Sequence, residues 1–410
     1  MPYPRRPRRD PPSSPRRLNP GRLAAVRALI AVEDGEHVED ALAKLAPQDP
    51  GDRALAWHVA LGVLRNRSAL DAAIREGARR APWTLDPPVL AALRVGLFEL
   101  AHSRTPPHAA VDQAVEACRA AGAPHASGLV NAVLRRPPYT PTPEEALGHP
   151  DWIVARWRAR YGEAADAWMA ANNQPAPVFV VAKEDPAGVA RDFQHRGLAL
   201  TPVGEGVFRL PEGAGAIEAL PGYEEGRWWV MDPAAVAVAD LVGEAVEVLD
   251  ACAAPGGKSF RLASRGARVF ATDVDEARLA RVQEGAERLD LPVWAEVHDW
   301  TKGPLARVFP AVLVDAPCTG LGTLRRHPDI RWRRKPEDVA RNADRQRVIL
   351  ANAARCVAPG GVLVYAVCSP EPEEGADVAA TLGWPEEARF VNAPALAGED
   401  CFQAFRLRRP

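Results

Sequence analysis

Beyond residue 226, short apolar strands alternate with amphipathic helices, and this rhythm constrains the fold more than any other feature of the chain. The predicted strands are residues 246–251, 268–273, 293–298, 311–316 and 361–367. Helices are predicted between them, notably 275–289 and 336–357. Such alternation builds a doubly wound parallel α/β sheet of the Rossmann-like kind, whose site lies at the carboxyl ends of the strands.

Three further parts precede this α/β domain of residues 226–410. Residues 1–17 form a basic, proline-rich tail that we expect to be disordered. Residues 18–137 carry apolar residues at helical spacing, which predicts an all-α domain. After a proline-rich connector, the segment 138–225 mixes both patterns and predicts a small α+β unit. Its predicted helices are 153–170 and 186–196, and its predicted strands are 178–182, 198–201 and 207–209.

Composition excludes several classes of protein. The formal net charge is -2, so overall charge neither supports nor excludes nucleic acid as a partner. The six cysteines include no C-x-x-C pair, and no metal is expected. No apolar stretch approaches the ~20 residues of a membrane helix, and the tail lacks the apolar core of a signal peptide. We therefore expect a soluble, cytoplasmic, monomeric protein without disulfides.

The first strand of the α/β domain ends in a turn of small residues, DACAAPGGKS, at 250–259. Gly256 and Gly257 let backbone N–H groups approach a ligand closely, and the start of the next helix favours a negative group. A nucleotide phosphate and a carboxylate-bearing cofactor both fit this description. A phosphate loop requires glycine where Cys252 stands, which argues against an ATPase, a GTPase or a phosphate-loop kinase.

Two acidic residues follow the next strands along the same edge. Asp273 closes the second strand, where a carboxylate can accept hydrogen bonds from both hydroxyls of a ribose. Asp299 follows the third strand, where an adenine edge could be read. A glycine-rich turn, a ribose-binding acid and a further polar residue favour S-adenosylmethionine, with a different nucleotide as the alternative.

The fourth and fifth strands each end beside a cysteine. The motifs are Asp315-Ala316-Pro317-Cys318 and Val367-Cys368-Ser369, and neighbouring parallel strands would hold both thiols over one pocket. Two thiols beside a site for S-adenosylmethionine suit methylation of carbon 5 of cytosine. This carbon is too weak a nucleophile to attack a methyl sulfonium until a thiolate has added to carbon 6. Asp315 could supply the hydrogen bond or proton that this addition needs near N3. The residues alone do not decide which thiol attacks.

A basic segment, LGTLRRHPDIRWRRK, follows Cys318. Basic side chains interleaved with an aromatic one suit an RNA strand whose target base is splayed out and stacked. The residues predicted to contact RNA are Arg325, Arg326, His327, Arg331 and Trp332.

Together, the motifs CAAPGGKS, DAPCTGLGTLRRHPDIRW and VYAVCS resemble the RNA cytosine-5 methyltransferase family typified by bacterial ribosomal small-subunit methyltransferase B (RsmB/Sun/Fmu). The segments HAAVDQAVEACR and GLVNAVLRR look like the NusB-like RNA-binding domain of this bacterial branch, and FQAFRL looks like its closing strand. The resemblance covers nearly the whole chain beyond the tail. It implies a NusB-like all-α domain, a small RNA-contacting subdomain and a methyltransferase domain that modifies 16S rRNA.

Carried over by position, the resemblance assigns roles to individual residues. It makes Cys368 the nucleophile and gives Cys318 a part in release of the methylated RNA. It assigns S-adenosylmethionine binding to Cys252, Ala253, Ala254, Pro255, Gly256, Gly257, Lys258, Asp273, Asp299 and Asp315.

The chain departs from the family pattern at two positions. Val367 stands where threonine usually precedes the nucleophile, and Thr319 stands where serine usually follows the Pro-Cys pair. The alternatives to the ribosomal enzyme are a tRNA cytosine-5 methyltransferase, which shares the chemistry, and an inactive RNA-binding assembly factor. Retention of both thiols, the glycine turn and all three acids argues against loss of activity.

Overall fold

The computed structural model describes residues 18–410, so the predicted basic tail lies outside the described residues. The chain divides into two compact units, which meet in the sequence at Gly148 and His149. Within residues 18–410, no helix is both long enough and apolar enough to cross a membrane.

The first unit is built of α-helices, as the sequence predicts. Two of them, α1 and α3, begin with proline at the first helical position. The preceding residue, Asn19 or Asp49, accepts a backbone N–H with its side chain. A buried Arg94, bonded to Asp71 and Glu33, joins three helices. The α-helices are α1 (Pro20–Glu33), α2 (Val38–Leu45), α3 (Pro50–Arg65), α4 (Arg67–Ala78), α5 (Pro87–His102), α6 (Pro107–Ala120), α7 (Ser127–Leu134) and α8 (Pro143–Leu147).

The second unit opens with the predicted α+β part, in which two details differ from the prediction. The helix predicted at 153–170 is two helices, because Gly162 takes a positive φ of 57° between them. The strand predicted at 198–201 lies at 201–204. The elements are α9 (Asp151–Tyr161), α10 (Ala164–Asn172), β1 (Phe179–Ala182), α11 (Pro186–His195), β2 (Thr201–Gly204), β3 (Val207–Arg209) and β4 (Trp228–Val230).

The small sheet is antiparallel and has the strand order β2-β3-β1-β4. Its last strand, β4, lies beyond residue 225, where the sequence predicts the α/β part to begin. Trp157 of α9 stacks on Trp168 of α10 with ring centroids 4.2 Å apart. This contact holds the two helices together as a hairpin.

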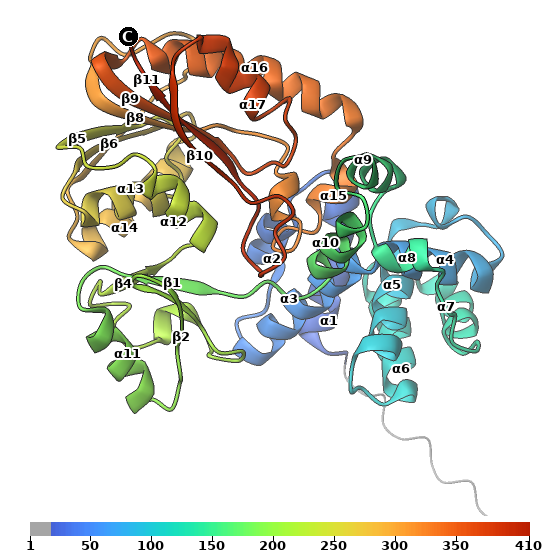
Figure 1. The fold of residues 1–410 in the computed structure, drawn as a ribbon. Helices are drawn as coiled ribbons and strands as arrows, with labels where there is room; N and C mark the ends of the chain where they lie inside the picture. The colour runs from blue at the N-terminus through green and yellow to red at the C-terminus, as the bar shows by residue number, and fades with distance from the viewer. Residues whose placement is uncertain (1–17) are drawn as a thin grey trace, which may run out of the picture. The chain divides into compact units, whose positions relative to one another are not determined.

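The larger sheet has seven strands in the order β10-β11-β9-β8-β5-β6-β7 (Figure 1). Its strands are β5 (Glu247–Asp250), β6 (Arg268–Asp273), β7 (Val293–Val297), β8 (Phe309–Asp315), β9 (Val357–Val367), β10 (Glu386–Val391) and β11 (Gln403–Arg408). Strands β5 to β9 are parallel, but β11 runs antiparallel to both β9 and β10. The prediction of a parallel sheet therefore holds for five strands, and the sheet as a whole is mixed.

Helices cover both faces of the larger sheet, which is what a doubly wound fold requires (Figure 1). Successive residues of a strand point to opposite faces, so Val248 packs into one core and Leu249 into the other. One core includes residues of α12 (Pro233–Asp240), α13 (Gly257–Ser264) and α14 (Glu276–Leu289), and the other includes residues of α16 (Pro336–Ala354) and α17 (Ala376–Ala379). The carboxyl ends of the parallel strands are thus left free to carry a site.

Candidate active site

The glycine turn leaves the carboxyl end of β5 and enters α13. Gly256 has a φ of 107°, and a Cβ there would lie 2.6 Å from the ring of Phe260, so only glycine fits. The backbone N–H groups in the first turn of α13 have no partners within the helix. Asp250, the last residue of β5, is fully buried; its Oδ2 accepts from Ser259 Oγ at 2.7 Å, but its Oδ1 has no hydrogen-bond partner. Burial raises the pKa of Asp250 to about 7.

The two acids of the neighbouring strands lie where the sequence places them. Asp273 ends β6, and its carboxylate accepts the backbone N–H groups of Ala254 at 3.2 Å and Asp275 at 3.1 Å. It is thereby fixed against the glycine turn. Asp299 follows β7, and hydrogen bonds from the side chain and backbone of Thr301 lower the pKa of its carboxyl.

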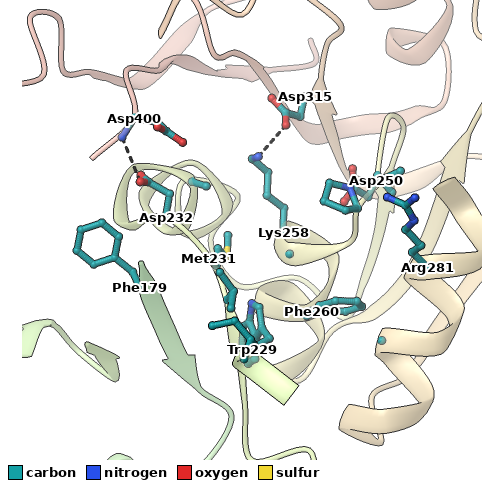
Figure 2. Close-up of a pocket in the computed structure, with 18 of the residues that line it drawn as sticks. Phe179, Trp229, Met231, Asp232, Asp250, Lys258, Phe260, Arg281, Asp315 and Asp400 are labelled. Atoms are coloured by element: carbon teal, nitrogen blue, oxygen red, sulfur yellow. Dashed lines mark hydrogen bonds and ion pairs between the residues drawn. The ribbon is translucent and has the colours of Figure 1, made fainter. Parts of the chain in front are cut away.

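An ion pair joins the glycine turn to the end of β8. Lys258 Nζ lies 2.7 Å from Asp315 Oδ2 (Figure 2). Burial opposes the charge on Lys258, but the Asp315 carboxylate outweighs it, and the lysine pKa is raised. Lys258 also lies 4.8 Å from the centre of the Phe402 ring, which favours the charged form further. The lysine therefore stays protonated at neutral pH.

The two cysteines predicted to share a site are adjacent. Cys318, after β8, and Cys368, after β9, have their Sγ atoms 3.3 Å apart. The hydrogen bond with Cys368, together with burial, raises the pKa of Cys318 well above that of a free thiol. Burial and the Asp250 carboxylate also raise the pKa of Cys252, so this thiol stays protonated. All the cysteines in the described residues are free thiols.

A cavity of about 670 Å³ opens between the glycine turn and the small sheet. Figure 2 shows Lys258, Asp315 and Asp250 on one side of it and Trp229, Met231 and Phe179 on another. Asp273, Asp299, Cys318 and Cys368 are not among the residues that line it. The thiols and the two strand-end acids thus lie outside the walls of this cavity, whereas the lysine and its aspartate face into it.

Sequence reasoning missed several acidic residues of this cavity, among them Asp232 and Asp400. Both carboxylates accept hydrogen bonds from Arg326, at 3.1 and 3.2 Å. Burial and the charge of Asp400 raise the pKa of Asp232 to about 7. The only sequence signal at Asp232 is that of a helix cap before Pro233, and its side chain does cap α12 by accepting from Ala234 N.

The basic segment after Cys318 is more deeply embedded than predicted. Arg331, in the short helix α15 (Ile330–Arg333), is fully buried and donates to Asn173 Oδ1 at 2.7 Å and to the carbonyls of Asn172 and Leu324. Arg331 thus bonds the loops around it and has no exposed surface in this structure, and its contact with RNA stays a prediction. Arg326 is engaged with Asp232 and Asp400, while Arg325, His327 and Trp332 are half-buried.

No cluster of three or more histidine, cysteine or acidic side chains in residues 18–410 is arranged to hold a metal ion. The strand ends carry a glycine turn that leads into α13, carboxylates at three strand ends, a charged lysine and two thiols. The first-turn N–H groups of α13, the unpartnered oxygen of Asp250 and the acid at the end of β6 fit a cofactor with a carboxylate, an ammonium group and a ribose.

Comparison with known proteins agrees with this architecture. Residues 239–399 match the model of the 16S rRNA methyltransferase RsmB/F family, 19–137 that of the NusB family, and 149–186 that of the ferredoxin-like domain of RsmF/B-like methyltransferases. Among solved structures, that of the protein PH0851 superposes with a TM-score of 0.80 at 21% identity, covering 95% of this chain and 99% of that one. NSun6 from Pyrococcus horikoshii superposes with a TM-score of 0.56 at 17% identity, covering 63% of this chain and 98% of that one. These likenesses concern the fold.

Curated relatives are more similar in sequence. Ribosomal RNA small subunit methyltransferase B of Xanthomonas campestris pv. campestris is 36% identical over 85% of this chain and 84% of its own length. The protein of the same name from Vibrio cholerae is 35% identical over 94% of this chain and 95% of its own length. Because these similarities extend over all three parts of the structure, the chain belongs to the family of ribosomal RNA small subunit methyltransferase B, whose cofactor is S-adenosylmethionine.

Proposed function

We propose that this protein transfers a methyl group from S-adenosylmethionine to carbon 5 of a cytosine in 16S rRNA, through a covalent bond between Cys368 and carbon 6. The observation that carries the proposal is the pair of sulfur atoms 3.3 Å apart at the ends of β8 and β9. Methylation of an exocyclic amine needs no thiol, whereas methylation of carbon 5 needs one to activate the ring.

The reaction assigns a separate task to each thiol. The Cys368 thiolate adds to carbon 6, the electrons of the 5,6 double bond make carbon 5 nucleophilic, and carbon 5 accepts the methyl group. A base, either the Asp315 carboxylate or water, then takes the carbon 5 proton, and elimination of the Cys368 thiolate restores the ring. The raised pKa of Cys318 keeps its proton at neutral pH, so Cys318 supports Cys368 by a hydrogen bond and assists the release of the product.

The ion pair of Lys258 and Asp315 serves the cytosine ring. Addition at carbon 6 moves electron density toward N3, and a proton donor there lowers the barrier. Lys258 is charged and faces the cavity together with Asp315, which holds its ammonium group in place. Lys258 therefore donates toward N3, and the Asp315 carboxylate positions its ammonium group.

The cofactor-binding residues are those expected from the sequence, with Asp250 added. Bound S-adenosylmethionine supplies an electrophilic methyl group on a sulfonium sulfur. The turn from Cys252 to Lys258 offers backbone N–H groups to its carboxylate, and the orphaned Oδ1 of Asp250 accepts from its ammonium group. Asp273 accepts from the ribose, and Asp299 reads the adenine.

RNA binding involves the exposed part of the basic segment and the NusB-like unit. Arg325, His327 and Trp332 follow Cys318 in the sequence and remain partly accessible. The assignment of 16S rRNA as substrate rests on the names of the curated relatives.

The test combines activity with identification of the product. The purified protein and a Cys368→Ala variant are incubated with labelled S-adenosylmethionine and unmodified 16S rRNA, and the modified nucleosides are identified by mass spectrometry. We expect 5-methylcytidine from the parent and none from the variant. Cys356→Ala, which alters a buried thiol packed beside α16, is the matched control and should retain activity.

Each other outcome changes a defined part of the proposal. Activity retained by Cys368→Ala would transfer the nucleophile to Cys318. A different methylated nucleoside would exclude carbon 5 chemistry. Methylation of tRNA in place of 16S rRNA would replace the substrate while preserving the mechanism.

A further inference from the structure

A buried carboxylate contacts the loops after β8 and β9, which carry Cys318 and Cys368, and the reaction as proposed does not use it. Glu374 stands in the loop that follows β9 and is fully buried. Its Oε1 accepts the backbone N–H of Thr319 at 2.7 Å. Its Oε2 accepts the hydroxyls of Thr319 at 2.5 Å and Ser369 at 2.6 Å. One side chain thus receives three hydrogen bonds from two loops.

Each bonded residue directly follows a thiol. Thr319 follows Cys318 on the loop after β8, and Ser369 follows Cys368 on the loop after β9. The two hydroxyls also lie 3.3 Å from each other. The two loops approach closely elsewhere, since Gly322 N donates to the carbonyl of Cys368 at 3.0 Å. A Cβ on Gly322 would lie 2.9 Å from that carbonyl oxygen, so only glycine allows the contact.

We propose that Glu374 is a positioning residue that sets the separation of the Cys318 and Cys368 sulfur atoms by bonding the residue next to each. It contacts neither thiol, and its effect passes through Thr319 and Ser369. As an explanation of catalysis, this inference rests on the proposed function, because it matters to the reaction only if the thiols carry it. As a statement about geometry, it stands on the hydrogen bonds alone.

The neighbouring acidic residues have different partners, which singles out Glu374. Glu371 is equally buried, but it pairs with Arg156, Arg160 and Trp157 of α9. Glu373 pairs with Arg156, and its side chain is 41% exposed. Only Glu374, among the acids of this loop, bonds the loop that carries Cys318. Thr319, which replaces the usual serine of the family, keeps the hydroxyl that this contact needs.

The first experiment measures the thiol separation without RNA or cofactor. Diamide oxidises two nearby thiols to a disulfide and takes up their two electrons and two protons. The full-length parent should form the Cys318–Cys368 disulfide rapidly, as followed by mass spectrometry of peptides after alkylation. The amide of Glu374→Gln has a single acceptor oxygen, so either the backbone N–H of Thr319 or the two hydroxyls lose their acceptor. We expect the rate to fall about tenfold, because misplacement of reacting atoms by ~1 Å costs one to two orders of magnitude. Glu373→Gln is the matched control and should react like the parent.

The second experiment measures methyl transfer by the same variants. We expect Glu374→Gln to lower kcat by roughly 10–100-fold while its KM and Kd for S-adenosylmethionine stay within about twofold of the parent values. A general loss of folding would change the cofactor affinity as well. Thr319→Ser, which keeps the hydroxyl, should behave like the parent, and Thr319→Val, which removes it, should show a smaller decrease in both the disulfide rate and kcat.

Parental rates of both reactions in Glu374→Gln would overturn the inference. Should Glu374→Gln fail to fold, Thr319→Val decides instead, and parental rates there would reject the positioning role. The proposed function fails separately: a parent that forms the disulfide quickly but methylates no cytosine leaves the geometric inference intact and removes its catalytic meaning.

Discussion

The loops at the strand ends and the basic segment that follows Cys318 differ in what their charged and polar side chains do. At the strand ends, Lys258 and Asp315 face a cavity, and the two thiols lie side by side. In the basic segment, Arg331 and Arg326 bind carbonyls, amides and carboxylates of the protein itself. The arginines of the basic segment therefore stabilise the fold, whereas the lysine and the cysteines at the strand ends are available for the reaction.

The contrast has a physical origin. A guanidinium group has five N–H donors and can satisfy several carbonyls of converging loops at once, so it suits a buried junction. A thiol or a primary amine makes fewer contacts and changes its protonation more readily. Substitutions at strand ends should therefore reduce rate at nearly constant stability, and substitutions at the buried arginines should reduce stability.

The largest expected effect is on rate, at Lys258. Lys258→Arg keeps a positive charge beside Asp315 but shifts its position and spreads it over a guanidinium group. We expect kcat to fall about 100-fold, since catalysis at this position depends on placement to within ~1 Å. The midpoint of thermal unfolding should change little. Lys302→Arg, at a lysine that is 83% exposed and pairs with Asp299, is the control and should leave both quantities unchanged. A stable Lys258→Arg variant with parental kcat would remove Lys258 from the reaction.

The next effect is on stability, at Arg331. Arg331→Met keeps the aliphatic bulk but removes the hydrogen bonds that Arg331 donates to Asn173 Oδ1 and to two buried carbonyls. We expect the free energy of unfolding in urea to fall by roughly 3–5 kcal/mol. Arg341→Met, which removes an exposed arginine paired with Asp338, should cost about 0–1 kcal/mol. If Arg331→Met instead remained stable and lost RNA affinity, Arg331 would contact RNA, as the sequence predicts.

The sequence predicted the strand-end site because the topology determines most of it. Once residues 268–273 and 311–316 are recognised as parallel strands, their last residues must meet at one edge of the sheet, whatever the packing. Asp273, Asp315 and both thiols follow from this argument. The all-α unit and the α+β unit follow in the same way from the periodicity of apolar residues.

The remainder depends on packing, which one-dimensional patterns do not contain. Asp232 carries only a capping signal in the sequence, and its role in the cavity comes from the approach of Asp400 and Arg326 from distant segments. The direction of β11 and the break at Gly162 also depend on tertiary context. Arg331 shows the limit most clearly, because an arginine in a basic run carries no mark that separates a buried donor from an exposed one.

A smaller effect concerns the pH dependence of stability, at Asp250. Its pKa is about 7 in the folded protein against an ordinary value of 3.8, so the folded state binds a proton that the unfolded state releases. The stability gained from this bound proton is complete below about pH 4 and is lost as the pH rises to about 7. The parent should therefore lose stability between pH 5 and pH 8, and Asp250→Asn should lose less, by on the order of 1–3 kcal/mol.

Asp299→Asn is the control for this comparison. Hydrogen bonds from Thr301 lower the pKa of Asp299, so its carboxyl is ionised throughout this range, and the variant should keep the parental pH dependence. Urea unfolding at several pH values, followed by tryptophan fluorescence, measures the slopes. Equal slopes for the parent and Asp250→Asn would show that Asp250 is ionised in the folded protein.

The smallest effect is expected at Val367, where the family usually has threonine. Val367 is fully buried directly before Cys368, so Val367→Thr places a hydroxyl within hydrogen-bonding range of the thiol loop or leaves it unsatisfied. An unsatisfied buried hydroxyl costs roughly 1–3 kcal/mol. Val364→Thr, at an equally buried position in the core of the same strand, provides the reference for that cost. We expect Val367→Thr to lose less stability than Val364→Thr and to change kcat by less than about threefold. Equal losses of stability would mean that the loop offers the hydroxyl no partner, and would place Val367 with the packing residues instead of with the site.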